Sequence, residues 1–472
     1  MNIKTYTLSI LLFAVSFVYS QPNPVSHIAI DTNSSVAVKK TIIRSYKKYA
    51  VSYIEDSGKH FYTITESHDV QNPASNMTIK KAEIDSRYDV TDFKVIDNYI
   101  YCCGNLPNNY AFVGFANIEE LLLNNNFDFY VYDNFCDVYD YDHYVEKLSK
   151  LEVYKVEDGF RVVAVGKTID RAFETKSCLL EIVISSLGNT NITYKVGESP
   201  LDVETINSLV VTDNYVATVG TLYENSTAIR RFDKNSIFAD TTNIKRVYTY
   251  PTNEIQVSLA IGEDRNNILA TPIIKDTIAV VSYWHPAPAA HLGSDLQGVL
   301  FRVYDINTSS VPTMVTSISL NHYNSMGNWK LNEFQYNSIL KAFTLLQYTN
   351  ISPNSLGSLF SVIKFNNNPI VQSEYYSNIE LNSLDNIRGT RYCLLSGYDM
   401  SSFYVMIATK IDNYTSTNTC GTYINGTTAS KTIYTSKIES EEMVTFGDNK
   451  SFTKVGSISI NTYPINEQCT KY

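Results

Sequence analysis

The chain has 472 residues, of which 44% are apolar, and it carries 38 Lys and Arg against 48 Asp and Glu. The apolar fraction is sufficient for a packed core and argues against an intrinsically disordered chain. A formal net charge of −10 argues against a dedicated nucleic-acid binder, which normally has a basic face. With 36 Tyr and 21 Phe, the composition favours β-strands.

Residues 1–20 have the features of a signal peptide. An apolar run of 11 residues, Leu8 to Val18, follows Lys4 and is too short to cross a bilayer as a helix. Small residues before the cleavage point predict processing after Ser20, which leaves Gln21 at the mature end. We therefore expect a secreted, periplasmic or cell-surface protein without a membrane span, an uncleaved N-terminal anchor being the alternative.

One pattern recurs along the mature chain: a strand, a short polar turn, a second strand, a loop and a third strand. A fourth strand is predicted in several units, for instance Met77 to Ile84. The second strands are mostly apolar, and three of the seven share a Tyr-x4-Gly pattern. They begin, at a mean spacing of about 57 residues, at Tyr49, Tyr99, Phe160, Tyr215, Ile278, Ile339 and Tyr392.

Four antiparallel strands repeated seven times are typical of a β-propeller. We predict an all-β protein with a single β-propeller spanning residues 21–472, most simply with seven four-stranded blades in about residues 27–412. A solenoid of β-hairpins is the structural alternative. A strand at His27 to Ile30 is expected to close the ring by joining the last blade. Residues 413–472 would supply closing strands, which complete the last blade, or a small C-terminal extension.

The repeat resembles an exported β-propeller of bacterial type, which implies a fold and no particular activity. The WD dipeptide of WD40 repeats and the paired glycines of kelch repeats are missing, so the repeat matches no characterised family. Neither G-x-S-x-G nor H-E-x-x-H occurs. We therefore assign no catalytic residue from the sequence.

The strongest candidate for a binding region is the segment between the second and third strands of the fifth unit. Loops at this position lie on the propeller face that usually carries ligand sites, and Trp and Tyr suit stacking on sugars or anchoring a protein. The candidate residues are Tyr283, Trp284, His285, His291 and Asp295. The commoner outcome for such a segment is a Pro-stiffened loop that packs Trp284 on its neighbour and leaves both histidines solvated.

Asp and Tyr alternate between Asp128 and Lys150. Dense carboxylates can bind Ca²⁺, which takes oxygen ligands. The candidate metal ligands are Asp133, Asp137, Asp140 and Asp142. Because the Gly turn of known calcium loops is missing, the pattern favours a solvated acidic edge over a Ca²⁺ site. No other cofactor is expected.

Seven cysteines are too few for a disulfide scaffold in a chain of this length. If a disulfide forms, we expect it between Cys420 and Cys469, which flank the terminal segment. Cys102 and Cys103 lie in a strand-like run, where neighbouring side chains point to opposite faces. We expect them to be two separate buried thiols.

Our first functional interpretation is a monomeric, non-enzymatic binding protein that presents aromatic-rich loops to a glycan or a protein partner. The alternative is a polysaccharide-degrading propeller enzyme, a glycoside hydrolase or lyase. Glycoside hydrolysis needs two carboxylates on opposite sides of one bond, and nothing among the 48 acids singles out a pair. A central pocket with converging Asp, Glu, Arg or His would favour the enzyme, and a Tyr/Trp platform would favour the binder.

Overall fold

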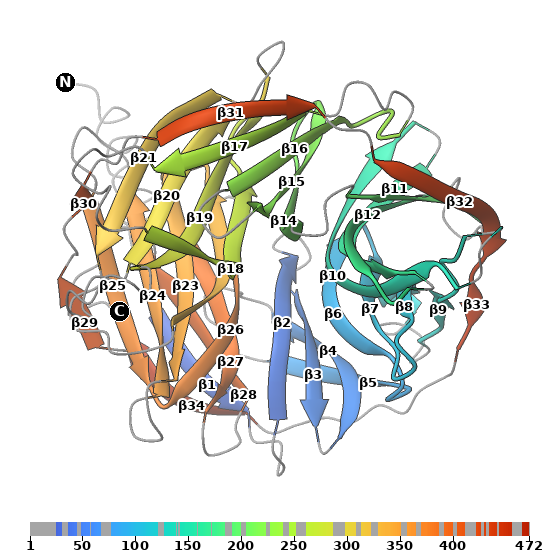
Figure 1. The fold of residues 1–472 in the computed structure, drawn as a ribbon. Helices are drawn as coiled ribbons and strands as arrows, with labels where there is room; N and C mark the ends of the chain where they lie inside the picture. Colours follow the sequence, from blue (N-terminus) through green and yellow to red (C-terminus); the bar gives the residue numbers. More distant parts are fainter. Residues whose placement is uncertain are drawn as a thin grey trace, which may run out of the picture.

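The computed structural model consists almost entirely of β-strands (Figure 1). No helix in the part of the chain that it describes is long and apolar enough to cross a bilayer. The described part is residues 25–471 except 31–35, 45–48, 57, 68–76, 121–126, 138, 140–141, 158, 171, 185–190, 200–203, 223–226, 239–244, 252–260, 287–297, 308–312, 322–328, 351–355, 365–369, 387–390, 400–403, 411–421, 426–428, 431–433, 441–442 and 456–464. The predicted signal peptide lies outside it.

Hydrogen bonds divide the strands into seven antiparallel sheets, which we number in chain order. Sheet 1 contains β2 (Val36–Arg44), β3 (Tyr49–Asp56), β4 (Lys59–Ser67) and β5 (Met77–Ile84). Sheet 2 contains β6 (Asp89–Ile96), β7 (Tyr99–Asn105), β8 (Ala111–Asn117) and β9 (Phe129–Tyr132). Sheet 3 contains β10 (Tyr144–Val156), β11 (Gly159–Ile169), β12 (Thr175–Ile184) and β13 (Asn191–Glu198).

The remaining four sheets follow the same order from first to last strand. Sheet 4 contains β14 (Glu204–Val211), β15 (Tyr215–Leu222), β16 (Thr227–Asp233) and β17 (Lys245–Pro251). Sheet 5 contains β18 (Ile261–Pro272), β19 (Thr277–Pro286), β20 (Gly298–Asp305) and β21 (Thr313–Asn321). Sheet 6 contains β22 (Trp329–Asn337), β23 (Ala342–Asn350), β24 (Leu356–Lys364) and β25 (Ile370–Ser377). Sheet 7 contains β26 (Ile379–Asn386), β27 (Tyr392–Asp399), β28 (Tyr404–Lys410) and β1 (Val25–Ile30).

The first strand of each sheet is the inner strand of the arrangement. Each inner strand contacts the inner strands of the sheets before and after it, and β26 contacts β2. The N-terminal strand β1 pairs with β28, so that Ile30 lies opposite Tyr404. Ring closure by an N-terminal strand at residues 27–30 was therefore predicted correctly.

The all-β class and the β-propeller arrangement are confirmed. The predicted number of seven blades with four strands each is not confirmed. The propeller has six blades by count, with three to five strands each. The hydrogen-bonding pattern, by contrast, separates seven sheets. The strand number differs because C-terminal strands are added to most sheets.

The C-terminal segment forms what we call the outer belt, which runs along the rim of the propeller (red in Figure 1). Its strands add to the outer edges of sheets 6, 5, 4, 3, 2 and 7 in that order. They are β29 (Thr422–Asn425), β30 (Ala429–Ser430), β31 (Tyr434–Ser440), β32 (Val444–Ser451), β33 (Thr453–Lys454) and β34 (Ile465–Lys471). The expectation that this segment completes only the last blade is wrong. Exposed sheet edges have unpaired N–H and C=O groups, which a single passing segment can satisfy on several sheets.

The core lies between neighbouring sheets, where buried apolar side chains form continuous clusters. Tyr101 of sheet 2 packs on Phe160 of sheet 3, for example, with ring centroids 5.9 Å apart. The second strands are buried on both faces as a result, which explains their apolar sequences. Six of the seven predicted second strands are found in place, but the sixth begins at Ala342 because Ile339 and Lys341 form the preceding turn.

Every inner strand has a register shift against its second strand. The side chain of the residue after the shift often accepts a hydrogen bond from the next inner strand. Asp92 Oδ2, for example, accepts a hydrogen bond of 2.9 Å from Leu151 N. Ser208 Oγ accepts from Ala270 N at 3.0 Å, and Ser383 Oγ accepts from Thr41 N at 2.8 Å. These bonds join neighbouring sheets around the centre.

The glycine of the Tyr-x4-Gly pattern lies opposite the register shift. It pairs with the residue just before the shift, as Gly220 does with Ile206. A Cβ atom at Gly220 would lie 1.6 Å from the carbonyl oxygen of Thr205. Gly104, Gly166 and Gly397 face the inner-strand backbone in the same way. The motif is therefore required by close approach of two backbones.

We expect Gly220→Ala to lower the free energy of unfolding by at least about 2 kcal/mol, because the new methyl group overlaps a backbone carbonyl that cannot move alone. Gly58→Ala is the control. Gly58 has φ of +75° and nothing near its Cβ position, so only the conformational cost of about 1 kcal/mol applies. Urea unfolding measures both, and equal losses would contradict the argument.

Candidate functional site

The propeller has two ends, which we name by their connections. At the loop end, second strands connect to third strands and each sheet connects to the next. At the turn end, first strands connect to second strands. The predicted binding region belongs to the loop end, but Tyr283, Trp284 and His285 lie within β19 rather than in a loop. Trp284 is paired with Glu263 on one side and Gly298 on the other.

The other two candidates, His291 and Asp295, lie outside the described residues. Whether the Trp284 region binds a ligand stays a prediction. The strand extends into the segment that was expected to be a loop, because backbone pairing with β18 continues to Pro286 and pairing with β20 continues to Trp284.

The acidic candidates for Ca²⁺ do not converge among the described residues, where no group of three or more His, Cys, Asp or Glu side chains is arranged to hold a metal. Asp137 Oδ1 accepts a hydrogen bond from Tyr139 N at 2.9 Å. Asp133 and Asp142 lie in the connection between β9 and β10, and Asp140 is outside the described residues. The Ca²⁺ hypothesis stays a prediction that these contacts do not support.

Among the cysteines whose side chains the structure describes, five are free and buried: Cys102, Cys103, Cys136, Cys178 and Cys393. Two separate thiols at Cys102 and Cys103 were expected, and this is confirmed. Cys420 lies outside the described residues and Cys469 lies in β34, so the disulfide between them stays a prediction.

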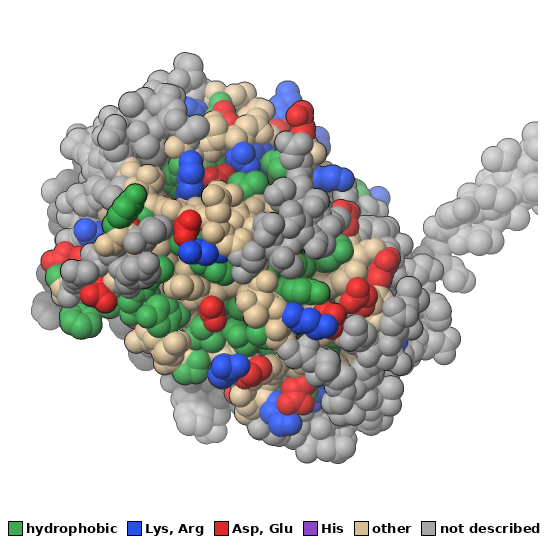
Figure 2. Space-filling view, turned by 90° about the vertical axis from the view of Figure 1, so that its right-hand side faces the viewer, with side chains coloured by type: hydrophobic (Ala, Val, Ile, Leu, Met, Phe, Trp, Pro, Cys, Tyr) green, Lys and Arg blue, Asp and Glu red, His purple; other side chains and the backbone are tan. Residues whose placement is uncertain are grey.

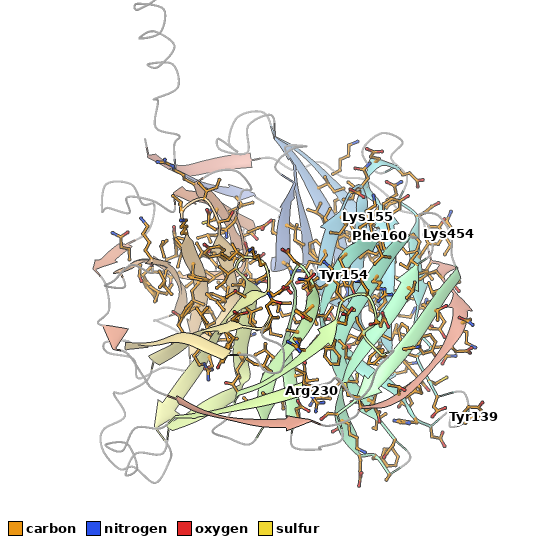
Figure 3. All side chains as sticks on the ribbon, turned by 90° about the horizontal axis from the view of Figure 1, so that it is seen from above. Tyr139, Tyr154, Lys155, Phe160, Arg230 and Lys454 are labelled. Carbon is orange, nitrogen blue, oxygen red and sulfur yellow. The ribbon has the colours of Figure 1, made fainter. Side chains whose placement is uncertain are left out.

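The loop end of sheet 3 displays two aromatic side chains to solvent. Tyr139 is 97% exposed in the connection from β9 to β10, and Figure 3 shows it projecting from the periphery. The base of this connection is fixed by a bridge between Cys136 and Tyr144 and by a hydrogen bond of 2.6 Å between His143 Nε2 and Glu198 Oε1. Tyr139 is therefore held out by an anchored loop.

Phe173 is the second exposed ring, at 82%, in the turn between β11 and β12. Its φ of +60° is a conformation that bulky residues rarely adopt. Asp170 Oδ1 accepts hydrogen bonds from Ala172 N and Glu174 N, at 2.9 and 3.0 Å, and so holds the turn. An exposed ring makes little packing contact that could offset this conformation, which makes Phe173 a candidate for a functional residue.

The two turns lie at the same end of one hairpin. Tyr144 at the start of β10 pairs with Ile169 at the end of β11, so the chain reaches Tyr139 and Phe173 from adjacent positions. The ring of Tyr144 also lies 4.5 Å from that of Tyr110, in the connection between β7 and β8. We call Tyr110, Tyr139, Tyr144 and Phe173 the aromatic surface.

A central cavity of about 290 Å³ is the second candidate. Its lining residues come mainly from the later halves of the inner strands, toward the turn end. They include three lysines and three carboxylates: Lys40, Lys94, Lys150, Asp92, Glu152 and Glu333. Sequence reasoning missed this set, because the register shifts that turn these side chains inward leave no residue-type signal.

The carboxylates of the cavity are paired with lysines. Asp92 forms a buried ion pair with Lys40, and Glu152 Oε1 lies 2.7 Å from Lys94 Nζ. Burial alone raises the pKa of Asp92, but Lys40, Lys150 and Lys94 outweigh it and hold the pKa below its usual value. Asp92 is thus ionised near neutral pH and cannot act as the proton donor that glycoside hydrolysis requires.

The face shown in Figure 2 has mixed chemistry. On the face shown in Figure 2, Lys, Arg, Asp and Glu side chains are interspersed with hydrophobic ones. Two further large hydrophobic residues are exposed at the turn end, Ile274 at 62% and Ile339 at 51%. They lie in different sheets, in the turns β18–β19 and β22–β23.

Comparison with models of known protein families gives no match, and no curated protein is significantly similar to the chain. Its function therefore has to be inferred from its own residues.

We expect Asp92→Asn to lower stability by about 3 kcal/mol at pH 7, because it leaves Lys40 buried without its main partner. The pKa of Asp92 is lower in the folded protein than in the unfolded chain. The ionised carboxylate therefore adds to the free energy of unfolding above the pKa of the unfolded chain, and this contribution is lost as the pH falls through the lower pKa of the folded protein. The difference between wild type and variant should therefore shrink below about pH 4.

Glu152→Gln is the matched control, since the Lys94–Glu152 pair is about a quarter exposed and should contribute about 1 kcal/mol or less. Urea titrations from pH 3 to pH 7 measure both. A loss in Asp92→Asn that does not change with pH would contradict an electrostatic role.

Proposed function

We propose that this is a non-enzymatic binding protein that uses the aromatic surface to contact a protein partner. The observation that carries the proposal is Phe173, an exposed ring held at positive φ. Such strain costs about 1–2 kcal/mol, and no packing contact of an exposed ring offsets it. Burial of the ring in a complex would offset this cost.

The shape of the surface favours a protein over a glycan. Small-molecule sites are usually concave, whereas Tyr139 and Phe173 project from turns with 97% and 82% of their surface exposed. Projecting aromatic residues are typical anchors that fill pockets on a partner protein. A glycan would instead require a groove beside the rings.

Charge supports a basic partner. Asp137 and Asp170 hold the two turns, and Asp142 and Glu174 are exposed beside them. The whole chain has a net charge of −10. A partner with Lys or Arg around an apolar pocket would be attracted to this surface and would associate faster at low salt.

The alternative, a polysaccharide-degrading enzyme, draws on the convergence of Asp92, Glu152 and Glu333 at the central cavity. It is the weaker proposal because Asp92 and Glu152 are engaged by lysines and because Asp92 is held ionised. We interpret these ion pairs as interactions that stabilise the ring of sheets.

We also propose that all seven sheets act as blades of one ring. The support is the cyclic order of inner-strand contacts, in which β2, β6, β10, β14, β18, β22 and β26 each touch two neighbours. A density map viewed along the ring axis distinguishes this arrangement from a ring of six.

Export is proposed from the sequence of residues 1–20. Cleavage after Ser20 would place Gln21 at the first position of the mature protein. Mass spectrometry of protein recovered from the envelope or the medium measures this, and an intact Met1 would contradict cleavage.

We expect the double variant Tyr139→Ala/Phe173→Ala to weaken partner binding by at least about 2 kcal/mol, roughly 30-fold, with no loss of stability. Phe173→Gly should raise the free energy of unfolding by up to about 1 kcal/mol, since glycine adopts positive φ without strain. Cross-linking and pull-down from the native source, followed by calorimetry with the recovered partner, measure binding.

Ile274→Ala/Ile339→Ala is the control, because it removes exposed apolar surface from the turn end. It should leave binding unchanged. The proposal fails if both double variants bind equally, or if Tyr139→Ala/Phe173→Ala lowers stability by several kcal/mol. Binding of soluble glycans that depends on Tyr139 and Phe173 would replace the protein partner by a sugar.

A further inference from the structure

A cavity of about 360 Å³ lies between sheets 3 and 4. It is lined by the start of β11, the end of β12, the start of β13 and the segment 235–238 that follows β16. These elements all meet at the turn end. The cavity is thus separate from the aromatic surface, which lies at the loop end. It shares no lining residue with the central cavity.

Arg161 supplies a hydrogen-bond donor that the protein does not satisfy. Its Nη1 is occupied, 3.0 Å from Glu181 Oε1 and 3.1 Å from the carbonyl oxygen of Lys234. Its Nε is buried and has no hydrogen-bond partner among the described residues. An unsatisfied buried donor costs about 1–3 kcal/mol. Because Nε has almost no accessible surface, a ligand would meet Arg161 at the part of its side chain that lines the cavity.

The cavity has an excess of positive charge. Lys195 lines it together with Arg161, and Glu181 is its one carboxylate. The ion pair with Arg161 Nη1 already engages Glu181, which leaves Lys195 and the rest of the Arg161 guanidinium to interact with a ligand. Burial raises the pKa of Glu181, against the opposing effect of Arg161 and Lys195.

The other side of the cavity is apolar. Ile237 and Phe238 are almost fully buried, and Val183 adds to the same wall. The Phe238 ring lies directly on β13, since a Cβ atom at Gly197 would be 2.5 Å from Phe238 Cε1. The cavity therefore combines apolar lining residues with two cations.

We propose that this cavity binds a small organic carboxylate with an apolar or aromatic body. The carboxylate would accept hydrogen bonds from the guanidinium of Arg161 and from Lys195, because a planar guanidinium suits the two oxygens of a carboxylate. The body of the ligand would pack on Phe238 and Ile237. The proposal does not depend on the function proposed for the aromatic surface.

The test uses benzoate as probe, with acetate and inorganic phosphate for comparison, and the full mature chain. Isothermal titration at constant ionic strength should give saturable benzoate binding at a single site. We expect at least 10-fold weaker binding in Arg161→Gln, and 3- to 10-fold weaker binding in Lys195→Gln. Acetate should bind more weakly than benzoate, because it lacks the apolar body.

Lys167→Gln is the matched control, since it removes an exposed lysine from the same strand as Arg161 but away from the cavity. It should bind benzoate like wild type, as should Tyr139→Ala/Phe173→Ala. If circular dichroism shows that Arg161→Gln is poorly folded, Arg161→Lys and Lys195→Gln test the proposal, because Arg161→Lys keeps a positive charge beside Glu181 and Lys195→Gln leaves Arg161 in place. Both should weaken benzoate binding.

Three results would overturn the proposal. They are the absence of saturable binding for every anion, equal benzoate binding in wild type and both cavity variants, and phosphate binding tighter than benzoate. The last would show an anion site without the apolar selectivity that Phe238 implies.

Discussion

The register shift in each inner strand is the constraint on which the rest of the propeller depends. It places one side chain of the strand at the junction with the next sheet, where Asp92, Ser208 and Ser383 accept backbone N–H groups of the following inner strand. It also brings two backbones so close that the opposing residue in four sheets is glycine. Junctions between sheets are therefore built from main chain as well as from packed side chains.

The same shifts turn charged residues toward the centre. Buried charges are costly unless they are paired, and the central cavity meets this requirement with Lys40, Asp92, Lys94 and Glu152. The pairing that stabilises the ring also keeps Asp92 ionised. A structural role for the centre and a binding role for the periphery are consistent with each other.

The outer belt solves a different problem. Propeller sheets leave an outer edge whose N–H and C=O groups are open to pairing with other chains. The C-terminal strands cover that edge in six of the seven sheets, in reverse order from sheet 6 to sheet 2 and then on sheet 7. Display of Tyr139 is linked to the belt as well, because His143 at the base of its loop packs 4.9 Å from the ring of Phe446 in β32.

The sequence by itself determined the strands, the repeat, the all-β class and the role of the N-terminal strand, because these follow from local alternation of apolar residues and from turn chemistry. It also indicated the Tyr- and Asp-rich connection that contains Tyr139. It did not indicate Phe173, whose exposure and positive φ depend on how the turn at Asp170 is held. The central charges, Arg161 with its cavity, and the spread of the C-terminal strands over six sheets were decided only by tertiary structure. Each of these joins residues from different sheets, and no local pattern records which sheet edges and which side chains will meet once the ring has closed.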